Sequence, residues 1–206
     1  MASLYFYFST MNAGKSTGLL QANYNYGERE LGTLVMKPGI DDRENGAIIK
    51  SRIGLESPCL MFGKDENLYD LVYDRIKAGE EINCVLIDEA QFMEPIQVTQ
   101  LGMVVDCLKV PVMCYGLRTD FRGELFPGSA KLMAIANDMF EVRTICWCGK
   151  RAQQVLRLDD QGKVIREGDV VVTGGNERYV SVCREHHRLG IIRKASKVKQ
   201  IHFHEN

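Results

Sequence analysis

The segment Ser9–Thr17 constrains the fold most, because it joins an apolar run to a stretch of helix-forming residues. Leu4 to Phe8 reads LYFYF and predicts a buried strand, whereas Thr17 to Glu30 predicts a helix. The residues between them, STMNAGKS, match the pattern G-x-x-x-x-G-K-[ST], except that Ser9 replaces the first glycine. The sequence therefore predicts a strand, a loop and a helix in direct succession.

This loop pattern is typical of a phosphate-binding site. Backbone N–H groups of the loop and of the helix N-terminus can surround phosphate oxygens. Lys15 supplies a cation for the β- and γ-phosphates, and the Ser16 hydroxyl can bind Mg²⁺. The alternative is an ordinary turn that contains Gly-Lys-Ser by chance. The flanking strand and helix favour the phosphate-binding interpretation.

An acidic pair follows a second buried strand, Cys84 to Ile87 (CVLI). Asp88 comes directly after this strand, where a carboxylate beside the loop can hold Mg²⁺ through its waters. Glu89 is next and can orient a water in an ATPase or accept a proton from a substrate hydroxyl in a kinase. The alternative for Glu89 is a solvated carboxylate at a strand end. The residues alone thus predict a P-loop NTPase or kinase.

Strands and helices alternate over the first two thirds of the chain. Further strands are expected at 33–37 and 112–115, and further helices at 67–78, 95–108 and 130–136. The polar stretch 41–58 predicts a loop, and 116–126, rich in charge and aromatic residues, predicts an active-site loop. This alternation predicts an α/β fold of the P-loop NTPase type, a mainly parallel sheet flanked by helices.

The pattern changes after about Glu141 to short apolar runs separated by turns. We therefore expect a catalytic, ATP-binding domain over 1–143, a small metal-binding module over 144–193 and a polar tail over 194–206. Cys146, Cys148, Cys183 and His186 lie at the two ends of this module in the patterns C-x-C and C-x-x-H. Four such ligands predict a closed, structural Zn²⁺ site. Unbound thiols and His187 as the fourth ligand are the alternatives.

Composition limits the class of partner. The formal net charge of −1 argues against a protein that binds a nucleic-acid backbone. The first ten residues have no basic region before an apolar run, and no apolar stretch approaches the ~20 residues of a membrane span. An odd number of cysteines, seven, fits a reducing compartment. We expect a cytoplasmic protein.

Six motifs together resemble the type II thymidine kinases, the cytosolic tetrameric class, and most closely their bacterial members. The motifs are MNAGKST at 11–17, IDDR at 40–43, IDEAQF at 87–92, YGLRTDFRGELF at 115–126, CWCG at 146–149 and GGNERYVSVC at 174–183. The resemblance extends to about residue 190. It departs from the family pattern at Ser9 and in the C-x-C and C-x-x-H ligand pairs, and both departures are familiar among bacterial members.

The resemblance implies transfer of the γ-phosphoryl group of ATP to the 5′-hydroxyl of thymidine or deoxyuridine. Glu89 would be the general base. The residues implied for ATP and Mg²⁺ are Ser9, Thr10, Met11, Asn12, Ala13, Gly14, Lys15, Ser16, Thr17, Asp41, Arg43, Asp88, Glu89, Ala90 and Gln91. Asp42 is the next candidate if the D-x-R register shifts by one residue.

The resemblance also implies a thymine pocket. Its apolar lining would come from Met11, Phe92, Leu117, Phe121 and Phe126. A lasso made of Val170, Val171, Val172, Thr173 and Gly174 would bind the edge of the base through its backbone, with Tyr179 beside it. Structural zinc would hold the two ends of this lasso.

The expected partners are ATP and thymidine, with thymidine triphosphate as a feedback ligand and a homotetramer as the assembly. Two other functions remain open: a P-loop ATPase that uses water as the acceptor, and a nucleic-acid-binding protein that reads through its zinc ribbon. A GTPase is disfavoured because the sequence lacks an N-K-x-D motif for guanine.

Overall fold

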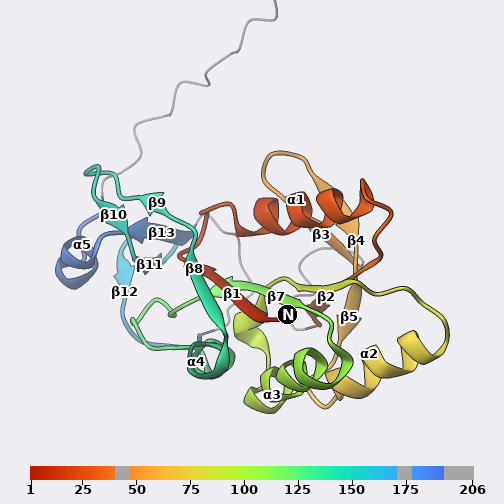
Figure 1. Ribbon diagram of the computed structural model, residues 1–206. Helices are drawn as coiled ribbons and strands as arrows, with labels where there is room; N and C mark the ends of the chain where they lie inside the picture. Colours follow the sequence, from red (N-terminus) through yellow and green to blue (C-terminus); the bar gives the residue numbers. More distant parts are fainter. Residues whose placement is uncertain (40–46, 171–177, 193–206) are drawn as a thin grey trace, which may run out of the picture.

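A computed structural model describes residues 1–39, 47–170 and 178–192 of the chain. Asp41 to Arg43, Val171 to Gly174 and the tail after Lys194, all included in the sequence predictions, lie outside the described residues. The described part contains a six-stranded sheet with helices on both faces and a smaller group of short strands beside it (Figure 1). None of the helices in the described ranges is long and apolar enough to cross a membrane.

The main sheet has the strand order β5-β2-β6-β7-β1-β8, and all of its pairings are parallel. Its strands are β1 (Leu4–Ser9), β2 (Thr33–Pro38), β5 (Leu60–Phe62), β6 (Cys84–Ile87), β7 (Val112–Leu117) and β8 (Asp138–Glu141). The predicted parallel α/β fold of the P-loop type is therefore confirmed.

Helices cover both faces of this sheet (Figure 1). They are α1 (Lys15–Gly27), α2 (Leu68–Lys77), α3 (Pro95–Met103) and α4 (Pro127–Ile135), and α3 continues into a π-helical turn, η2 (Val104–Leu108). Successive residues of a strand point to opposite faces. In β6, Val85 and Ile87 accordingly join the core under α2, α3 and α4, whereas Cys84 and Leu86 join the core under α1.

Local capping explains where two helices begin. The Asn67 side chain accepts hydrogen bonds from the amides of Tyr69 and Asp70 at 3.0 and 3.3 Å, which satisfies two free N–H groups at the start of α2. Helix α3 begins with Pro95 at its first position, and Glu94 and Gln97 form a reciprocal capping box.

The loop predicted over 41–58 is wrong for its described part. Strands β3 (Ile48–Lys50) and β4 (Glu56–Pro58) form an antiparallel hairpin. Ile49 is buried in the core under α1 and supplies the apolar contact that holds the hairpin. Three-residue strands are too short to show a period in the sequence. The same reason explains why the short edge strand β5 was not predicted. Strand β8 has four residues but is mostly exposed, so no continuous apolar run marks it in the sequence.

The second group of strands follows β8 directly. It contains β9 (Thr144–Ile145), β10 (Arg151–Ala152), β11 (Gln154–Leu158), β12 (Val164–Ile165), β13 (Tyr179–Val182) and the short helix α5 (Arg184–Leu189). Strands β12, β11 and β13 form an antiparallel sheet with a small core of its own, which includes Leu156 and Val182. A core this small commonly needs a metal or a cross-link to be stable.

Several hydrogen bonds attach these strands to the main sheet domain, and two of them involve residues that follow its central strands. The Ser181 hydroxyl donates to the Met11 carbonyl at 2.6 Å, and the Arg118 guanidinium donates to the Gln153 carbonyl at 3.1 Å. Met11 belongs to the loop after β1, and Arg118 follows β7. Both attachments thus lie at the carboxyl ends of central strands.

Candidate active site

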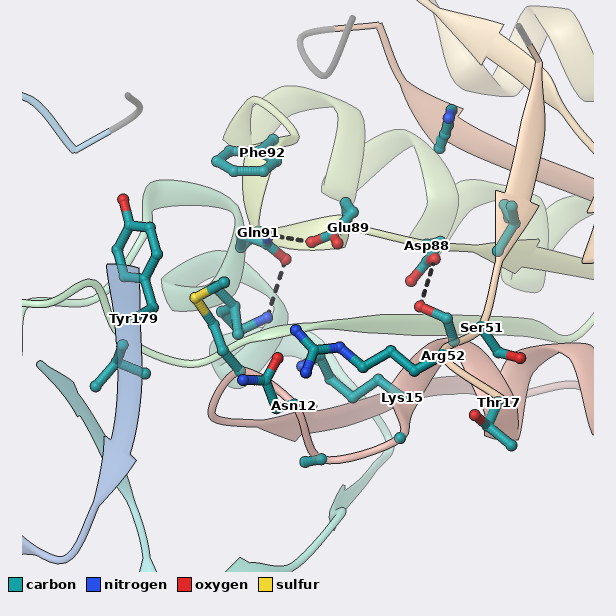
Figure 2. Close-up of a pocket in the computed structure, with 18 of the residues that line it drawn as sticks. Asn12, Lys15, Thr17, Ser51, Arg52, Asp88, Glu89, Gln91, Phe92 and Tyr179 are labelled. Carbon is teal, nitrogen blue, oxygen red and sulfur yellow. Dashed lines mark hydrogen bonds between the residues drawn. The ribbon is translucent and has the colours of Figure 1, made fainter. Parts of the chain in front are cut away.

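A cleft of about 520 Å³ lies between the carboxyl ends of the central strands and the second group of strands (Figure 2). Crevices at this edge of a parallel sheet are where ligands bind in α/β proteins. The predicted site residues that line it are Met11, Asn12, Ala13, Gly14, Lys15, Ser16, Thr17, Asp88, Glu89, Gln91, Phe92, Leu117, Phe121, Phe126, Val170 and Tyr179. The structure therefore brings together residues from positions 11 to 179.

Among the predicted residues that the structure describes, three do not line the cleft: Ser9, Thr10 and Ala90. The Ser9 hydroxyl donates to the Val142 carbonyl, which connects the start of the loop to the end of β8. Thr10 offers its carbonyl to the Lys15 ammonium at 2.8 Å. These contacts fix the loop from the side that faces away from the cleft.

The loop after β1 turns sharply and then starts helix α1. Gly14, with φ of 84°, is the residue before the helix, and Asn12 also has a positive φ, 63°. Glycine adopts this conformation without strain, which explains its place there. The first N–H groups of α1 thus face the cleft, where they favour an anion.

Lys15 is the buried cation of this wall, with 9% of its surface exposed. Burial lowers the pKa of Lys15, although the carboxylates of Glu89 and Asp88 act in the opposite direction. The Lys15 ammonium donates to the Thr10 carbonyl. A phosphate group in the cleft would be a stronger partner for it.

Ser16 and Asp88 meet across the cleft floor. The Ser16 hydroxyl donates to Asp88 Oδ2 at 2.9 Å (Figure 2). Asp88 is 5% exposed, and burial together with the neighbouring Glu89 raises the pKa of its carboxyl to about 7. A hydroxyl and a carboxylate in contact are oxygen ligands of the kind that suits Mg²⁺ and its waters.

Glu89 leaves the strand direction because its backbone is left-handed, with φ of 50° and ψ of 37°. Strict alternation after Asp88 would have placed its side chain on the other face of the sheet. The short 3₁₀ turn η1 (Ala90–Phe92) begins immediately after it. Consequently both carboxylates line the same cleft (Figure 2).

Gln91 holds the Glu89 carboxylate. Its side-chain amide donates to Glu89 Oε2 at 2.5 Å, and its amide oxygen accepts from the Leu117 N–H at 2.9 Å. Gln91 is 1% exposed. A Cβ on Gly116 would lie 2.9 Å from Gln91 Oε1, and one on Gly128 would lie 2.6 Å from the Met93 carbonyl. These two glycines therefore allow β7 and α4 to pack closely against the η1 turn.

Three basic residues of the cleft, Lys37, Lys50 and Arg52, were not predicted from the sequence. Arg52, in the β3–β4 hairpin, extends its guanidinium into the cleft near Lys15 (Figure 2). Lys37 is buried at the end of β2, lines the same cleft and donates to the Ile48 carbonyl at 3.0 Å. The position of Lys37 at the end of an apolar strand could have identified it from the sequence as a cleft residue. Arg52 had no such signal, because its hairpin was interpreted as a loop.

The opposite part of the cleft is apolar and aromatic. Phe92 and Phe126 pack edge to face, with ring centroids 5.7 Å apart. Leu117, Phe121 and Tyr179 also line this part. Apolar walls with a few directed polar groups are typical of sites for small planar ligands. The cleft thus has a charged half and an aromatic half.

Cys146, Cys148, Cys183 and His186 form a separate cluster whose ligand atoms all lie within 4.8 Å of one another. Two neighbouring sulfur atoms, those of Cys148 and Cys183, are 3.9 Å apart, and His186 Nδ1 is 3.3 Å from Cys146 Sγ. A tetrahedral Zn²⁺ with Zn–S bonds of about 2.3 Å needs ligand atoms roughly 3.8 Å apart. The cluster could therefore hold a metal ion of this kind.

The electrostatics of one residue of this cluster, Cys146, suit a metal ligand. Burial alone would raise the pKa of Cys146, but hydrogen bonds from the Cys148 backbone and the His186 ring outweigh it and lower the pKa to about 6. A thiol in this state is readily ionised, as a metal ligand must be. His187 is not part of the cluster, because its Nε2 donates to the Phe121 carbonyl at 2.9 Å.

The parallel sheet, the loop between β1 and α1, and the Ser16–Asp88 pair define a protein of the P-loop nucleotide-binding class. The model of one family, thymidine kinase, matches residues 2–187. The chain therefore belongs to the thymidine kinase family, as the motifs predicted.

Individual relatives agree with this assignment. A thymidine kinase of Haemophilus influenzae is 54% identical over 188 residues, 91% of this chain and 97% of the relative. One of Rhizobium etli is 56% identical over 186 residues, 90% of this chain and 93% of the relative. One of Escherichia coli strain K12 is 51% identical over 209 residues and covers the full length of both chains.

Proposed function

We propose that this chain is an ATP-dependent kinase that phosphorylates the 5′-hydroxyl of thymidine, and of deoxyuridine as a second substrate. The 5′ oxygen attacks the γ-phosphorus of ATP while the bond from that phosphorus to the β–γ bridging oxygen breaks. The hydroxyl proton passes to Glu89, and the products are ADP and thymidine monophosphate. The reaction would supply DNA precursors by nucleotide salvage.

The charged half of the cleft would bind the triphosphate. Backbone N–H groups from Met11 to Thr17 surround the phosphates, and Lys15 exchanges its bond to Thr10 for the β- and γ-oxygens. Ser16 and Asp88 would hold Mg²⁺, and the ion would neutralise charge on the phosphates. Asp41 and Arg43 are proposed to act on the same phosphates and metal.

Glu89 is proposed as the general base because of how it is held. Gln91 donates to one of its carboxylate oxygens and is itself fixed by the Leu117 amide. An anchored carboxylate keeps its orientation while the acceptor hydroxyl approaches, which is the positioning that proton transfer needs. Gln91 would therefore position the base.

The aromatic half of the cleft would bind thymine. Phe92, Phe121 and Phe126 offer apolar surface for a flat ring with a methyl group. The segment from Val170 to Gly174 is proposed to bind the polar edge of the base through its backbone, and Tyr179 would pack beside it. Backbone hydrogen bonds of this kind would distinguish thymine from purines.

The cysteine and histidine cluster is proposed as a structural Zn²⁺ site. Four protein ligands complete a tetrahedron and leave no position for a reacting water. The metal would stabilise residues 144–193 as a module distinct from the catalytic domain, 1–143, and from a tail, 194–206. The start of β9 after the last strand of the main sheet supports this division.

The assembly and its control are proposed from the family. We expect a cytoplasmic homotetramer that thymidine triphosphate inhibits, with no nucleic-acid or membrane partner. Light scattering after size-exclusion chromatography tests the tetramer. Kinase assays at varied thymidine concentration, with and without thymidine triphosphate, test the inhibition.

One observation supports the kinase most strongly: a phosphate-binding loop, a carboxylate pair and an aromatic wall line a single cleft. The test is incubation with ATP and Mg²⁺, with thymidine, deoxyuridine, another nucleoside or no acceptor. We expect ADP and thymidine monophosphate in equal amounts and little ADP without an acceptor. ATP hydrolysis that proceeds without thymidine and yields no monophosphate would instead identify a water-using ATPase.

A further inference from the structure

Phe121 belongs to a tight turn, 120–124, in which the Asp120 amide donates to the Glu124 carbonyl at 2.8 Å and the Asp120 carboxylate is buried. Asp120 Oδ1 accepts from the amides of Arg122 and Glu124 at 2.9 and 3.0 Å, and Oδ2 accepts from Arg122 Nε at 2.7 Å. A side chain that bonds the backbone of its own turn fixes that turn. The Phe121 ring, which is 2% exposed and lines the cleft, therefore has a defined position.

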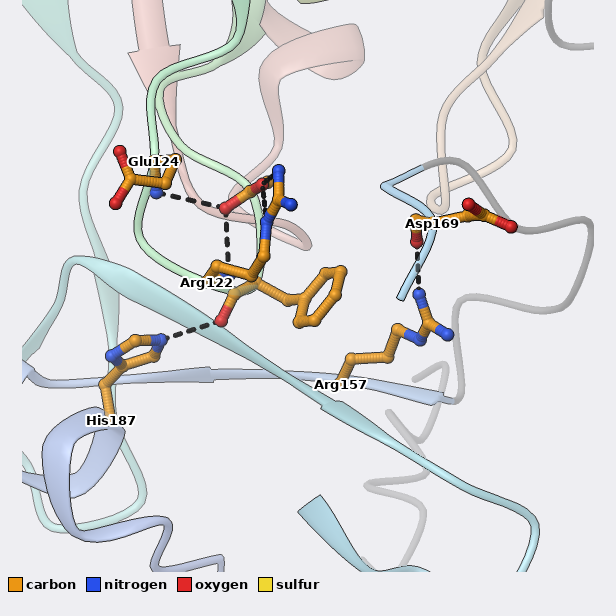
Figure 3. A network of polar contacts seen from close by, with 7 residues as sticks. Arg122, Glu124, Arg157, Asp169 and His187 are labelled. Carbon is orange, nitrogen blue, oxygen red and sulfur yellow. Dashed lines mark hydrogen bonds and ion pairs between the residues drawn. The ribbon is translucent and has the colours of Figure 1, made fainter. Parts of the chain in front are cut away.

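The second group of strands holds Phe121 from two further directions. His187 Nε2 donates to the Phe121 carbonyl at 2.9 Å (Figure 3). The Arg157 guanidinium lies over the ring, 4.7 Å from its centroid. A cation this close to an aromatic face is attracted by the negative charge density of the ring. The aromatic wall of the cleft thus depends on residues outside the main sheet domain.

Arg157 makes a second contact, with the chain that enters the proposed base-binding segment. Its Nη1 donates to the Asp169 carbonyl (Figure 3). The next residue, Val170, lines the cleft. Arg157 also pairs directly opposite Tyr179 in the β11–β13 ladder, and Tyr179 lines the cleft as well. One side chain therefore bridges Phe121 and Asp169 from a strand that also positions Tyr179.

Arginine suits this bridge better than other residues. Its guanidinium is planar, so it can stack on a ring while the N–H groups at its edge remain free to donate in the plane. A lysine ammonium is a compact charge on a flexible chain and cannot hold both contacts with fixed geometry. The arrangement thus requires the shape of the guanidinium in addition to its charge.

We propose that Arg157 is a positioning residue for the nucleoside. It fixes the separation between the Phe121 ring and the chain at Asp169–Val170, which are two sides of the space that the base would occupy. This role rests on the proposed function, because it assigns the base to the aromatic half of the cleft. It acts on the acceptor and not on ATP, since both of its contacts lie away from the loop at 9–17.

The test uses the full-length, metal-loaded protein and the variants Arg157→Lys and Arg157→Ala. Arg151→Ala is the matched control, because it removes an arginine of the same group of strands that pairs with Glu141 outside the cleft. We expect Arg157→Ala to raise the KM for thymidine about tenfold and leave the KM for ATP within about twofold, the size of effect expected when a partly buried cation–π contact and a charged hydrogen bond are lost together. The KM of Arg157→Lys for thymidine should lie between those of Arg157→Ala and the wild type.

A second measurement separates this proposal from the proposed function. Hydrogen exchange of the ligand-free protein should become faster at the amides near 121 and 168–170 in Arg157→Ala, and stay unchanged in Arg151→Ala. If wild-type protein does not phosphorylate thymidine, the proposed function fails, and the exchange result still decides whether the bridge exists.

Two results would overturn the positioning role. One is a thymidine KM in Arg157→Ala equal to that of the wild type. The other is a parallel rise of both KM values with loss of bound metal, which would identify Arg157 as a residue that merely stabilises the fold. Unchanged hydrogen exchange of Arg157→Ala near residues 121 and 168–170 would show that Arg157 does not bridge these two segments.

Discussion

Replacing Asp88 with asparagine should make the free protein more stable while it abolishes activity. Burial and the neighbouring Glu89 raise the pKa of the Asp88 carboxyl from 3.8 to about 7. The folded protein therefore binds this proton more tightly than the unfolded chain. By linkage, the wild type loses stability as pH rises from about 4 to about 7, and the loss is constant above that range. Asparagine carries no charge and lacks this penalty.

The pKa of Asp88 and its contacts set the expected gain in stability of Asp88→Asn. The pKa difference, at about 1.4 kcal/mol for each pH unit, gives an upper limit of ~4 kcal/mol. Asparagine keeps an oxygen that accepts from Ser16, so that hydrogen bond is retained. Relaxation around a buried charge reduces the gain. We expect about 2 kcal/mol at pH 8, which for a chain of this length raises the melting temperature by roughly 4–8 °C.

The assay is thermal unfolding of wild-type, Asp88→Asn and Asp106→Asn proteins at pH 5, 6, 7 and 8, with the structural metal bound and without nucleotide or Mg²⁺. Asp106 is exposed and serves as the control for loss of a carboxylate. The advantage of Asp88→Asn should grow with pH and level off above about 7. An advantage that is equal at every pH, or a less stable Asp88→Asn at pH 8, would refute the reasoning.

Three further substitutions test the rest of the site. Glu89→Gln should lower turnover by about 10²–10⁴ while ATP binding persists; a wild-type rate in a single-turnover assay would exclude Glu89 as the base. Cys183→Ala should release the metal and raise the thymidine KM, and full activity in protein shown to be metal-free by mass spectrometry would contradict it. Ser181→Ala removes the 2.6 Å hydrogen bond to the Met11 carbonyl. It should lower the free energy of unfolding by about 1 kcal/mol and weaken ATP binding severalfold. Ser181→Thr should stay close to the wild type when ATP binding and unfolding are measured by calorimetry.

The central strands and the loop between β1 and α1 could be predicted because their sequence signals are local. Strand β6 begins and ends at the residues predicted, and helix α1 begins at Lys15, directly after Gly14 and two residues before the predicted start. A continuous apolar run and a glycine before a helix depend only on neighbouring residues. The cysteine and histidine cluster could be predicted equally well, because the types and the spacing of its residues can be read directly from the sequence.

Features that depend on distant contacts could not be predicted. Gln91 shows no sequence sign that it holds Glu89, because its partner Leu117 lies 26 residues away. Arg52 reaches the cleft only because a three-residue strand pairs with another. Arg157 looks like any polar residue on a strand until β11 packs beside Phe121. In each case tertiary structure decides the role, and a single sequence carries no record of it.

The left-handed backbone of Glu89 has a consequence for evolution and engineering. A non-glycine residue at φ of 50° costs of order 1–3 kcal/mol, and glycine would remove most of that cost. Asp88 next to it also weakens the fold above neutral pH. A selection for heat resistance alone would therefore favour Asp88→Asn and Glu89→Gly, and it would enrich inactive descendants. Thermostable descendants that still work must gain their stability elsewhere in the chain, so heat and turnover have to be screened together.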